Sequence, residues 1–184
     1  NSYKPIIALL PGSRKQEIDL ILPHMLSVVD NFPNFQFIIA CNNIFSKEYY
    51  NSFIKDLDVQ LVFNETHALL SHSKAALITS GTATLEAAFL KVPQVVCYKT
   101  NWLTYILARV MIKIQFLSLV NIILNKDVVK ELIQINLNKN NLIKELNFIL
   151  NRNNNILKDY DKIIDILNKK GASNNVARYI MDTI

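Results

Sequence analysis

Short apolar runs rich in Ile, Val, Leu and Phe alternate with segments in which apolar positions recur every three or four residues. The short runs predict buried β-strands, and the periodic segments predict amphipathic helices that pack on them. This alternation is typical of right-handed βαβ units in a parallel sheet that is covered on both faces. We expect strands at residues 5–10, 35–40, 59–63, 75–79 and 94–98, with helices at 15–31, 46–56 and 82–91.

After Tyr98 the pattern becomes mainly helical. It predicts a helix over 103–113, a short strand near 115–117 and helical periodicity from about Val128 onward. The chain then continues with three helical segments, at 139–151, 154–169 and 172–183. We therefore expect an α/β fold in two parts. Residues 1–135 form a parallel sheet flanked by helices, and residues 136–184 form a helical extension that packs on this domain, on a partner domain or on another chain.

Composition and charge narrow the class of protein. The chain has 184 residues, of which 51% are apolar and 19% charged, which excludes a mainly disordered polypeptide. Residues 91–130 hold six Lys or Arg residues against Asp127 alone, which favours an anionic partner such as a phosphate, a phospholipid or nucleic acid. The apolar stretch within this segment contains Arg109 and Lys113, so it does not predict a membrane span. The first residues do not resemble a signal peptide, so we expect a cytoplasmic protein.

Two of the three glycines, Gly12 and Gly81, come directly after a predicted strand and before a predicted helix. A helix N-terminus offers unpaired backbone N–H groups and a partial positive charge, and a glycine lets a phosphate approach the backbone closely. The carboxyl ends of parallel strands meet at one edge of the sheet, where α/β domains bind ligands. The two turns together therefore predict a site for a nucleotide diphosphate.

Polar side chains around the two turns add to this site. Ser13 contributes a hydroxyl, and the Arg14 guanidinium suits a bidentate contact with a phosphate. Thr82 and its neighbours contribute hydroxyls at the second turn, and Glu86 could accept hydrogen bonds from ribose hydroxyls. A simpler alternative stays open: Ser13 and Thr82 are N-caps, while Glu17 and Glu86 only support the first turns of their helices.

Several segments, in order and at their spacing, resemble the C-terminal half of the lipid-A-disaccharide synthase family. That half is the nucleotide-binding, Rossmann-like domain of a GT-B glycosyltransferase. The segments are LLPGSRKQEI (9–18), SGTATLEAA (80–88), PQVVCYK (93–99), FLSLVNIIL (116–124), VVKELIQ (128–134) and GASNNVARYI (171–180).

The resemblance implies an activity and a set of site residues. The family transfers a sugar from UDP-2,3-diacylglucosamine to 2,3-diacylglucosamine 1-phosphate, giving the β-1′,6-linked lipid A disaccharide and UDP, with no metal or cofactor. The resemblance implies that Gly12, Ser13 and Arg14 contact the diphosphate of the sugar donor. The remaining implied residues are Ser80, Gly81, Thr82 and Ala83 at the phosphates and sugar, Glu86 toward the ribose, and Asn121, Glu131 and Gln134 near the donor and the domain seam.

The resemblance also implies partners. The acceptor and the general base belong to an N-terminal domain that this chain lacks, so the catalytic residue stays unknown. We further expect peripheral contact with the inner face of the inner membrane, a homodimer, and no nucleic acid. Two other functions stay open: a UDP-sugar 2-epimerase on the same fold, and a nucleotide-sugar-binding module without activity of its own. His24, His67 and His72 show no spacing typical of a metal site or a catalytic triad.

Overall fold

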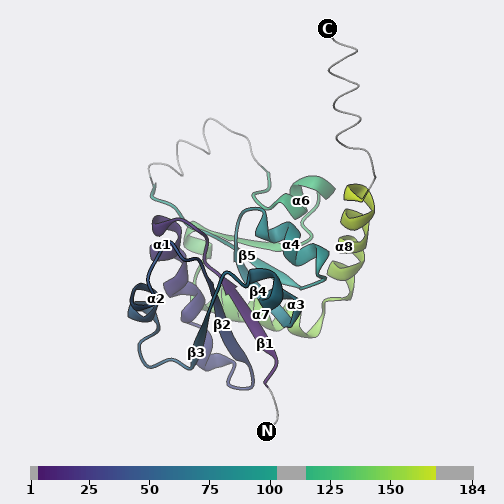
Figure 1. Cartoon of the computed structure of the whole chain (residues 1–184). Helices are drawn as coiled ribbons and strands as arrows, with labels where there is room; N and C mark the ends of the chain where they lie inside the picture. Colours follow the sequence, from purple (N-terminus) through teal and green to yellow (C-terminus); the bar gives the residue numbers. More distant parts are fainter. Residues whose placement is uncertain (1–3, 103–114, 169–184) are drawn as a thin grey trace.

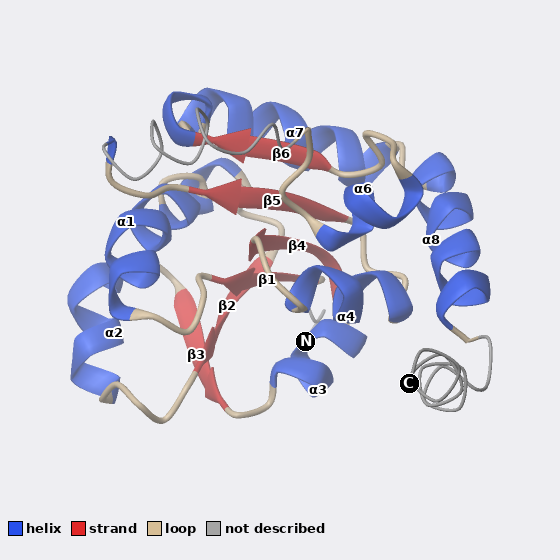
Figure 2. Ribbon diagram, turned by 90° about the horizontal axis from the view of Figure 1, so that it is seen from above, coloured by secondary structure: helices blue, strands red, loops and turns tan. Residues whose placement is uncertain are grey.

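The computed structural model describes residues 4–102 and 115–168, which form a six-stranded parallel sheet with helices on both faces (Figure 1, Figure 2). This arrangement confirms the predicted Rossmann-like α/β class. The strands are β1 (Ile6–Leu10), β2 (Gln36–Cys41), β3 (Val59–Phe63), β4 (Ser73–Thr79), β5 (Gln94–Tyr98) and β6 (Lys130–Ile133).

Helices cover the sheet in two layers, as Figure 2 shows. On one face lie α1, α2 and α7, and on the other lie α3 and α4, with α6 and α8 packed against α4. The helices are α1 (Lys15–Leu26), α2 (Lys47–Ile54), α3 (Thr66–Ser71), α4 (Ala83–Phe89), α6 (Leu119–Leu124), α7 (Lys139–Asn151) and α8 (Asn154–Leu167), with 3-10 turns at Val29–Asn31 and Gln134–Asn136.

The central strands are apolar on both sides because both faces are covered. In β1, Ile7 and Leu9 pack in the cluster that contains α1, whereas Ala8 and Leu10 pack in the cluster that contains α3. Successive side chains of a strand point to opposite faces, so a strand buried on both sides must be continuously apolar. This explains why the runs of the four inner strands, β1, β2, β4 and β5, could be recognised in the sequence.

The strand order, β3-β2-β1-β4-β5-β6, places the site. The chain moves outward from β1 through β2 to β3, and then crosses back to place β4 on the other side of β1. Connections therefore leave the carboxyl ends of β1 and β4 in opposite directions and open a crevice between them. In open α/β sheets, ligands bind in this crevice.

The chain beyond Tyr98 departs from the predicted pattern. The helical periodicity predicted from about Val128 is wrong at its start, since Lys130–Ile133 is strand β6, paired with β5 at the sheet edge. The strand predicted near 115–117 is also wrong, because those residues lie in a loop before α6. Helix α3 was not predicted.

The other helix predictions are confirmed apart from their ends. Helix α1 ends at Leu26 rather than at residue 31, and the 3-10 turn Val29–Asn31 follows it. In the predicted extension, α7 packs on β4 and β5 and α8 packs on α4. The segments 103–113 and 172–183, both predicted to be helical, lie outside the described residues, and the division at 135/136 stays a prediction.

Candidate functional site

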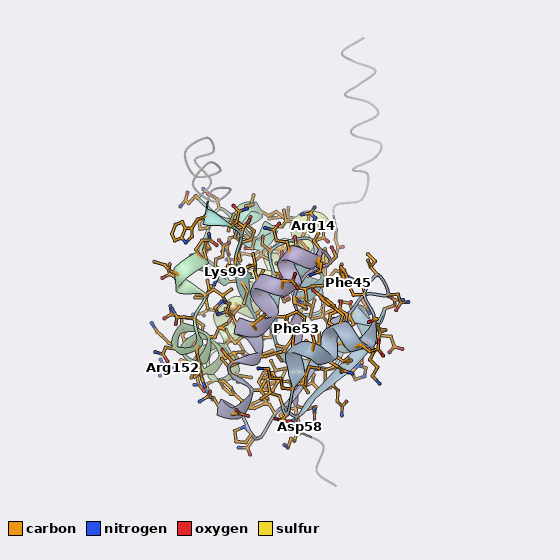
Figure 3. The ribbon with its side chains drawn as sticks, turned by 90° about the vertical axis from the view of Figure 1, so that its left-hand side faces the viewer. Arg14, Phe45, Phe53, Asp58, Lys99 and Arg152 are labelled. Carbon is orange, nitrogen blue, oxygen red and sulfur yellow. The ribbon has the colours of Figure 1, made fainter. Side chains whose placement is uncertain are left out.

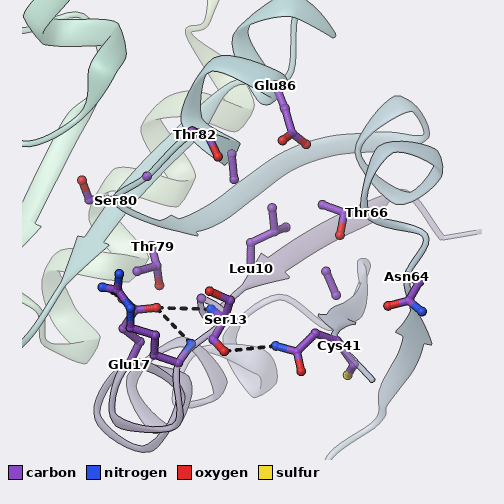
Figure 4. A pocket seen from close by; sticks show the side chains of 16 residues that line it. Leu10, Ser13, Glu17, Cys41, Asn64, Thr66, Thr79, Ser80, Thr82 and Glu86 are labelled. Atoms are coloured by element: carbon purple, nitrogen blue, oxygen red, sulfur yellow. Dashed lines mark hydrogen bonds and ion pairs between the residues drawn. The ribbon is translucent and has the colours of Figure 1, made fainter. Parts of the chain in front are cut away.

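A cavity of about 590 Å³ opens at the carboxyl ends of β1 and β4, within the size range of small-ligand sites. Figure 4 shows the Gly12 turn on one side, the turn after β4 above it, and Thr66 and Asn64 on the opposite side. The cavity is lined by Leu10, Gly12, Ser13, Arg14, Glu17, Ala40, Cys41, Asn42, Asn64, Thr66, Thr79, Ser80, Gly81, Thr82, Ala83 and Glu86.

The Gly12 turn holds an anionic group. One carboxylate oxygen of Glu17, Oε2, accepts hydrogen bonds from the backbone N–H groups of Ser13 (3.2 Å) and Arg14 (3.3 Å), and the other pairs with Arg14 Nη1 (3.3 Å). Figure 4 draws the two backbone hydrogen bonds of Glu17 as dashed lines. The turn therefore already binds a carboxylate in the way that it would bind a phosphate oxygen.

Gly12 is required at this turn by its backbone. Its φ angle is +103°, and a Cβ at this position would collide with Glu17 Oε2. We expect Gly12→Ala to lower the free energy of unfolding by about 1–3 kcal/mol, because a side chain is strained at this φ and displaces the carboxylate. Urea denaturation measures this loss.

Gly81→Ala is the matched control. Gly81 does not have a positive φ, and a Cβ there meets no atom within 4 Å. The control should change stability by less than about 1 kcal/mol. Equal losses for the two variants would contradict a special backbone requirement at Gly12.

The Arg14 guanidinium is available to a ligand. Its side chain is 82% exposed, and its ion pair with Glu17 is long and lies at the surface. Such a pair contributes little to stability. The Arg14 guanidinium could therefore bind a phosphate in the cavity instead of Glu17, with little loss of stability.

The turn after β4 is built from internal hydrogen bonds. Ser80 Oγ donates to the carbonyl oxygen of Leu117 (2.8 Å), and Thr84 Oγ1 donates to that of Gly81 (2.7 Å). Thr82 is the N-cap of α4, but its side chain makes no capping hydrogen bond, and the N-cap of α1 is Arg14 rather than Ser13. The alternative that Ser13 is an N-cap is therefore wrong, Thr82 holds the N-cap position without a capping hydrogen bond, and the support that Glu17 gives to α1 is confirmed.

Glu86 lies on α4, across the cavity from Glu17 (Figure 4). It is exposed, so its carboxylate is open to a ligand that enters the cavity. Helix α4 has only seven residues, so we expect this wall to contact a ligand through its hydroxyls and its carboxylate more than through the helix dipole. The predicted contact of Glu86 with a ribose stays a prediction.

Sequence reasoning missed the wall formed by Asn42, Asn64 and Thr66. These residues follow β2 and β3 at the same sheet edge, and Asn42 Nδ2 donates to the carbonyl oxygen of Ser13 (3.3 Å). The available signal was their position directly after predicted strands, without a glycine to mark the turn. They extend the cavity away from the Gly12 turn and provide room for a ligand longer than a diphosphate.

Comparisons with known proteins agree with this geometry. A family model described as lipid-A-disaccharide synthetase matches residues 1–183. The chain belongs to this family. The lipid-A-disaccharide synthase of Colwellia psychrerythraea is 31% identical over 98% of this chain and 48% of its own length. That of Psychromonas ingrahamii is 38% identical over 74% of this chain and 38% of its own length.

The chain thus spans about half the length, or less, of these two relatives of the lipid-A-disaccharide synthetase family. Among solved structures, a glycotransferase of kitacinnamycin superposes with a TM-score of 0.64 at 13% identity, over 97% of this chain and 43% of its own. This likeness supports the GT-B glycosyltransferase fold.

Two of the residues implied by the family resemblance, Asn121 and Glu131, lie behind the cavity rather than in it. Asn121 is fully buried; its Oδ1 accepts from the backbone N–H groups of Val128 and Val129 (2.9 Å each), and its Nδ2 donates to Glu131 (2.9 Å). The Glu131 carboxylate also accepts from the backbone N–H groups of Leu117 and Ser118. This buried network fixes the loop before α6.

The network reaches the cavity through one residue. Leu117 donates its N–H to Glu131 and accepts the Ser80 hydroxyl, so Glu131 and the cavity wall share this segment. Gln134 acts in a similar way at the end of β5, where its amide pairs with both the N–H and the carbonyl of Thr100 (3.0 Å each). In this structure Asn121, Glu131 and Gln134 hold backbone segments in place through hydrogen bonds. A contact of any of them with the UDP-sugar donor stays a prediction.

A histidine and a lysine meet beside α1. His24 Nε2 lies 2.7 Å from Lys99 Nζ, and burial, followed by the lysine charge, lowers the pKa of His24 below its ordinary value of 6.5. As the pH falls below 6.5, the unfolded chain binds a proton at this residue before the folded chain does. Stability is therefore retained above this pH and lost below it.

We expect the wild-type chain to lose more stability than His24→Gln when the pH is lowered from about 7.5 to about 5.5. Urea midpoints at the two pH values measure the difference. Equal losses would show that His24 does not contribute to the pH dependence.

Within 4–102 and 115–168, no group of three or more His, Cys, Asp or Glu side chains is arranged to hold a metal ion. No helix in this part of the chain is both long and apolar enough to span a bilayer. Cys41 and Cys97 are free and buried, and burial raises the pKa of the Cys41 thiol to about 12.

Proposed function

We propose that this chain is the donor-binding half of a lipid-A-disaccharide synthase, and that its cavity holds the UDP part of UDP-2,3-diacylglucosamine. The observation that carries the proposal is the Gly12 turn at the β1/β4 crevice, which already binds a carboxylate through two backbone N–H groups and Arg14. Membership of the lipid-A-disaccharide synthetase family supplies the substrate class.

Each wall of the cavity has a role in this proposal. The Gly12 turn and Arg14 bind the diphosphate and stabilise the negative charge that develops on UDP as it leaves. The backbone and hydroxyl of the Ser80–Ala83 segment line the sugar, and Glu86 accepts hydrogen bonds from the ribose. As the family resemblance implies, the proposed reaction uses no metal and no cofactor.

The remaining partners lie outside this chain. We propose that an N-terminal domain binds 2,3-diacylglucosamine 1-phosphate and supplies the general base, as the family resemblance implies. Exposed apolar side chains on α7 and α8, namely Phe148, Ile166 and Leu167, support a contact with that domain or with a second copy of this chain. Both substrates are acylated, so we place the enzyme in the cytoplasm, peripherally at the inner face of the inner membrane, without a nucleic-acid partner.

Calorimetry with UDP and an assay of UDP release test the proposal. UDP binding by the chain favours a transferase or an epimerase over a module that binds no nucleotide sugar. UDP release by the complete enzyme, only when both the donor and the diacyl acceptor are present, separates the transferase from a UDP-sugar 2-epimerase.

The isolated chain should give no disaccharide, because transfer requires the acceptor and its base to be held opposite the donor. Turnover by this chain alone on the order of 10 per second, a typical enzyme rate, would contradict the two-domain assignment.

A further inference from the structure

The cavity contains a buried hydroxyl without a partner. Within residues 4–102 and 115–168, two buried side-chain polar atoms make no hydrogen bond, Thr79 Oγ1 and Gln94 Oε1. Gln94 lies away from the cavity, and its Nε2 is satisfied by Thr84 and Tyr160. Thr79 lines the cavity and is only 6% exposed. Buried polar groups are nearly always paired in folded proteins, so an unpaired one needs an explanation.

Two neighbouring hydroxyls on the same segment, unlike that of Thr79, do make hydrogen bonds to backbone carbonyl oxygens. Ser80 donates to Leu117 and Thr84 donates to Gly81, so both hydroxyls are used to build the turn after β4. Thr79, at the last position of β4, contributes nothing to this framework through its hydroxyl. A purely structural role would be met equally well by valine, which has the same shape.

The Thr79 side chain lies on the α1 side of the sheet. It follows Leu77 by two positions, so the two side chains share a face, and Leu77 packs in the cluster that contains Ile18 of α1. Strand β4 pairs with β1, which leads directly into the Gly12 turn. Figure 4 draws Thr79 on the same side of the cavity as Ser13 and Glu17.

This is also where the cavity holds negative charge. The Glu17 carboxylate is bound by the N–H groups of Ser13 and Arg14, which marks the position of an anion in the cavity that Thr79 also lines. We propose that the Thr79 hydroxyl is a ligand-binding group that donates a hydrogen bond to the diphosphate held at the Gly12 turn. This inference rests on the proposed function and assigns to the same site a donor that the family resemblance did not indicate.

Contact with the ligand requires a small rearrangement. Thr79 Oγ1 is almost fully covered in the free chain, so a rotation about χ1, or a shift of the turn, must bring it to a phosphate oxygen. Binding then satisfies a hydroxyl that is unpaired in the free chain, and the ligand gains a charge-assisted hydrogen bond. Removal of the hydroxyl should therefore weaken ligand binding without weakening the fold.

The test compares Thr79→Val, which keeps the shape and removes the hydroxyl, with Thr79→Ser, which keeps the hydroxyl. Calorimetry with UDP and with inorganic pyrophosphate measures affinity, and urea denaturation measures stability. We expect Thr79→Val to bind both ligands about tenfold more weakly than the wild-type chain, with an unchanged or higher urea midpoint. Thr79→Ser should stay within about twofold of the wild-type affinity.

The outcomes separate the two proposals. If the wild-type chain binds UDP and Thr79→Val binds it equally well, the assignment of Thr79 is wrong while the proposed function stands. If Thr79→Val weakens UDP but not pyrophosphate, the hydroxyl does not contact the diphosphate, and the assignment is wrong as well. If the wild-type chain binds neither ligand, both the proposed function and the assignment fail.

Discussion

Replacement of Asn121 by alanine is expected to destabilise the chain by about 3–5 kcal/mol, the largest effect predicted for one side chain here. The substitution leaves the backbone N–H groups of Val128 and Val129 buried without an acceptor and removes a donor to Glu131. Each buried group left without its partner costs about 1–3 kcal/mol. For a chain of this length, the melting temperature should fall by roughly 10 °C.

Asn138→Ala is the matched control, because Asn138 is a half-buried N-cap whose side chain accepts one hydrogen bond, from the Asn141 N–H, and donates one to the carbonyl oxygen of Ile135. It should cost about 1 kcal/mol. Chemical denaturation of both variants tests the network. If Asn121→Ala loses no more unfolding free energy than Asn138→Ala and also binds UDP more weakly, the structural role of Asn121 is contradicted. Asn121 would then belong to the UDP site.

The second large effect concerns the ligand. Arg14→Ala should weaken UDP binding by about 1–3 kcal/mol, the cost of losing a charge-assisted contact with the diphosphate. Stability should hardly change, since the Arg14 side chain is exposed and its ion pair with Glu17 lies at the surface. Calorimetric titration with UDP measures the affinity.

Lys15→Ala controls for the loss of a positive charge near the site. Lys15 is adjacent in sequence, pairs with Asp19 and does not line the cavity, so its removal should alter UDP affinity less than Arg14→Ala does. Figure 3 labels Arg14 near the upper end of α1. If both variants bound UDP as tightly as the wild-type chain, a phosphate contact for Arg14 would be refuted.

Which parts of the fold could be predicted depended on burial. The four inner strands, β1, β2, β4 and β5, are covered on both faces, so each contains a continuous apolar run, and the helices between them show a clear apolar stripe. The edge strand β3 is only partly buried, but four of its five residues are apolar, which was enough to predict it. Strand β6 has the sequence KELI and only four residues at the sheet edge, so its charged positions matched a helix as well as a strand. Helix α3, with six residues, is too short to show a period.

The site was predictable where glycine marked it. Gly12 and Gly81 identified two turns that line one cavity, and the residues beside them followed. Asn42, Asn64 and Thr66 carried no such mark. Asn121 and Glu131 show the converse limit: a motif identifies a polar residue, but only the packing shows whether it faces a ligand or satisfies buried backbone groups.

One NMR titration tests the central claim, that UDP binds between the Gly12 and Gly81 turns. The chain has only three glycines, so selective ¹⁵N-glycine labelling gives backbone amide signals from Gly12, Gly81 and Gly171 alone. Gly12→Ala and Gly81→Ala assign the signals. We predict that UDP shifts the Gly12 and Gly81 signals along one saturable curve and leaves Gly171 unchanged. Saturable UDP binding that moves neither Gly12 nor Gly81 would contradict the site proposed here.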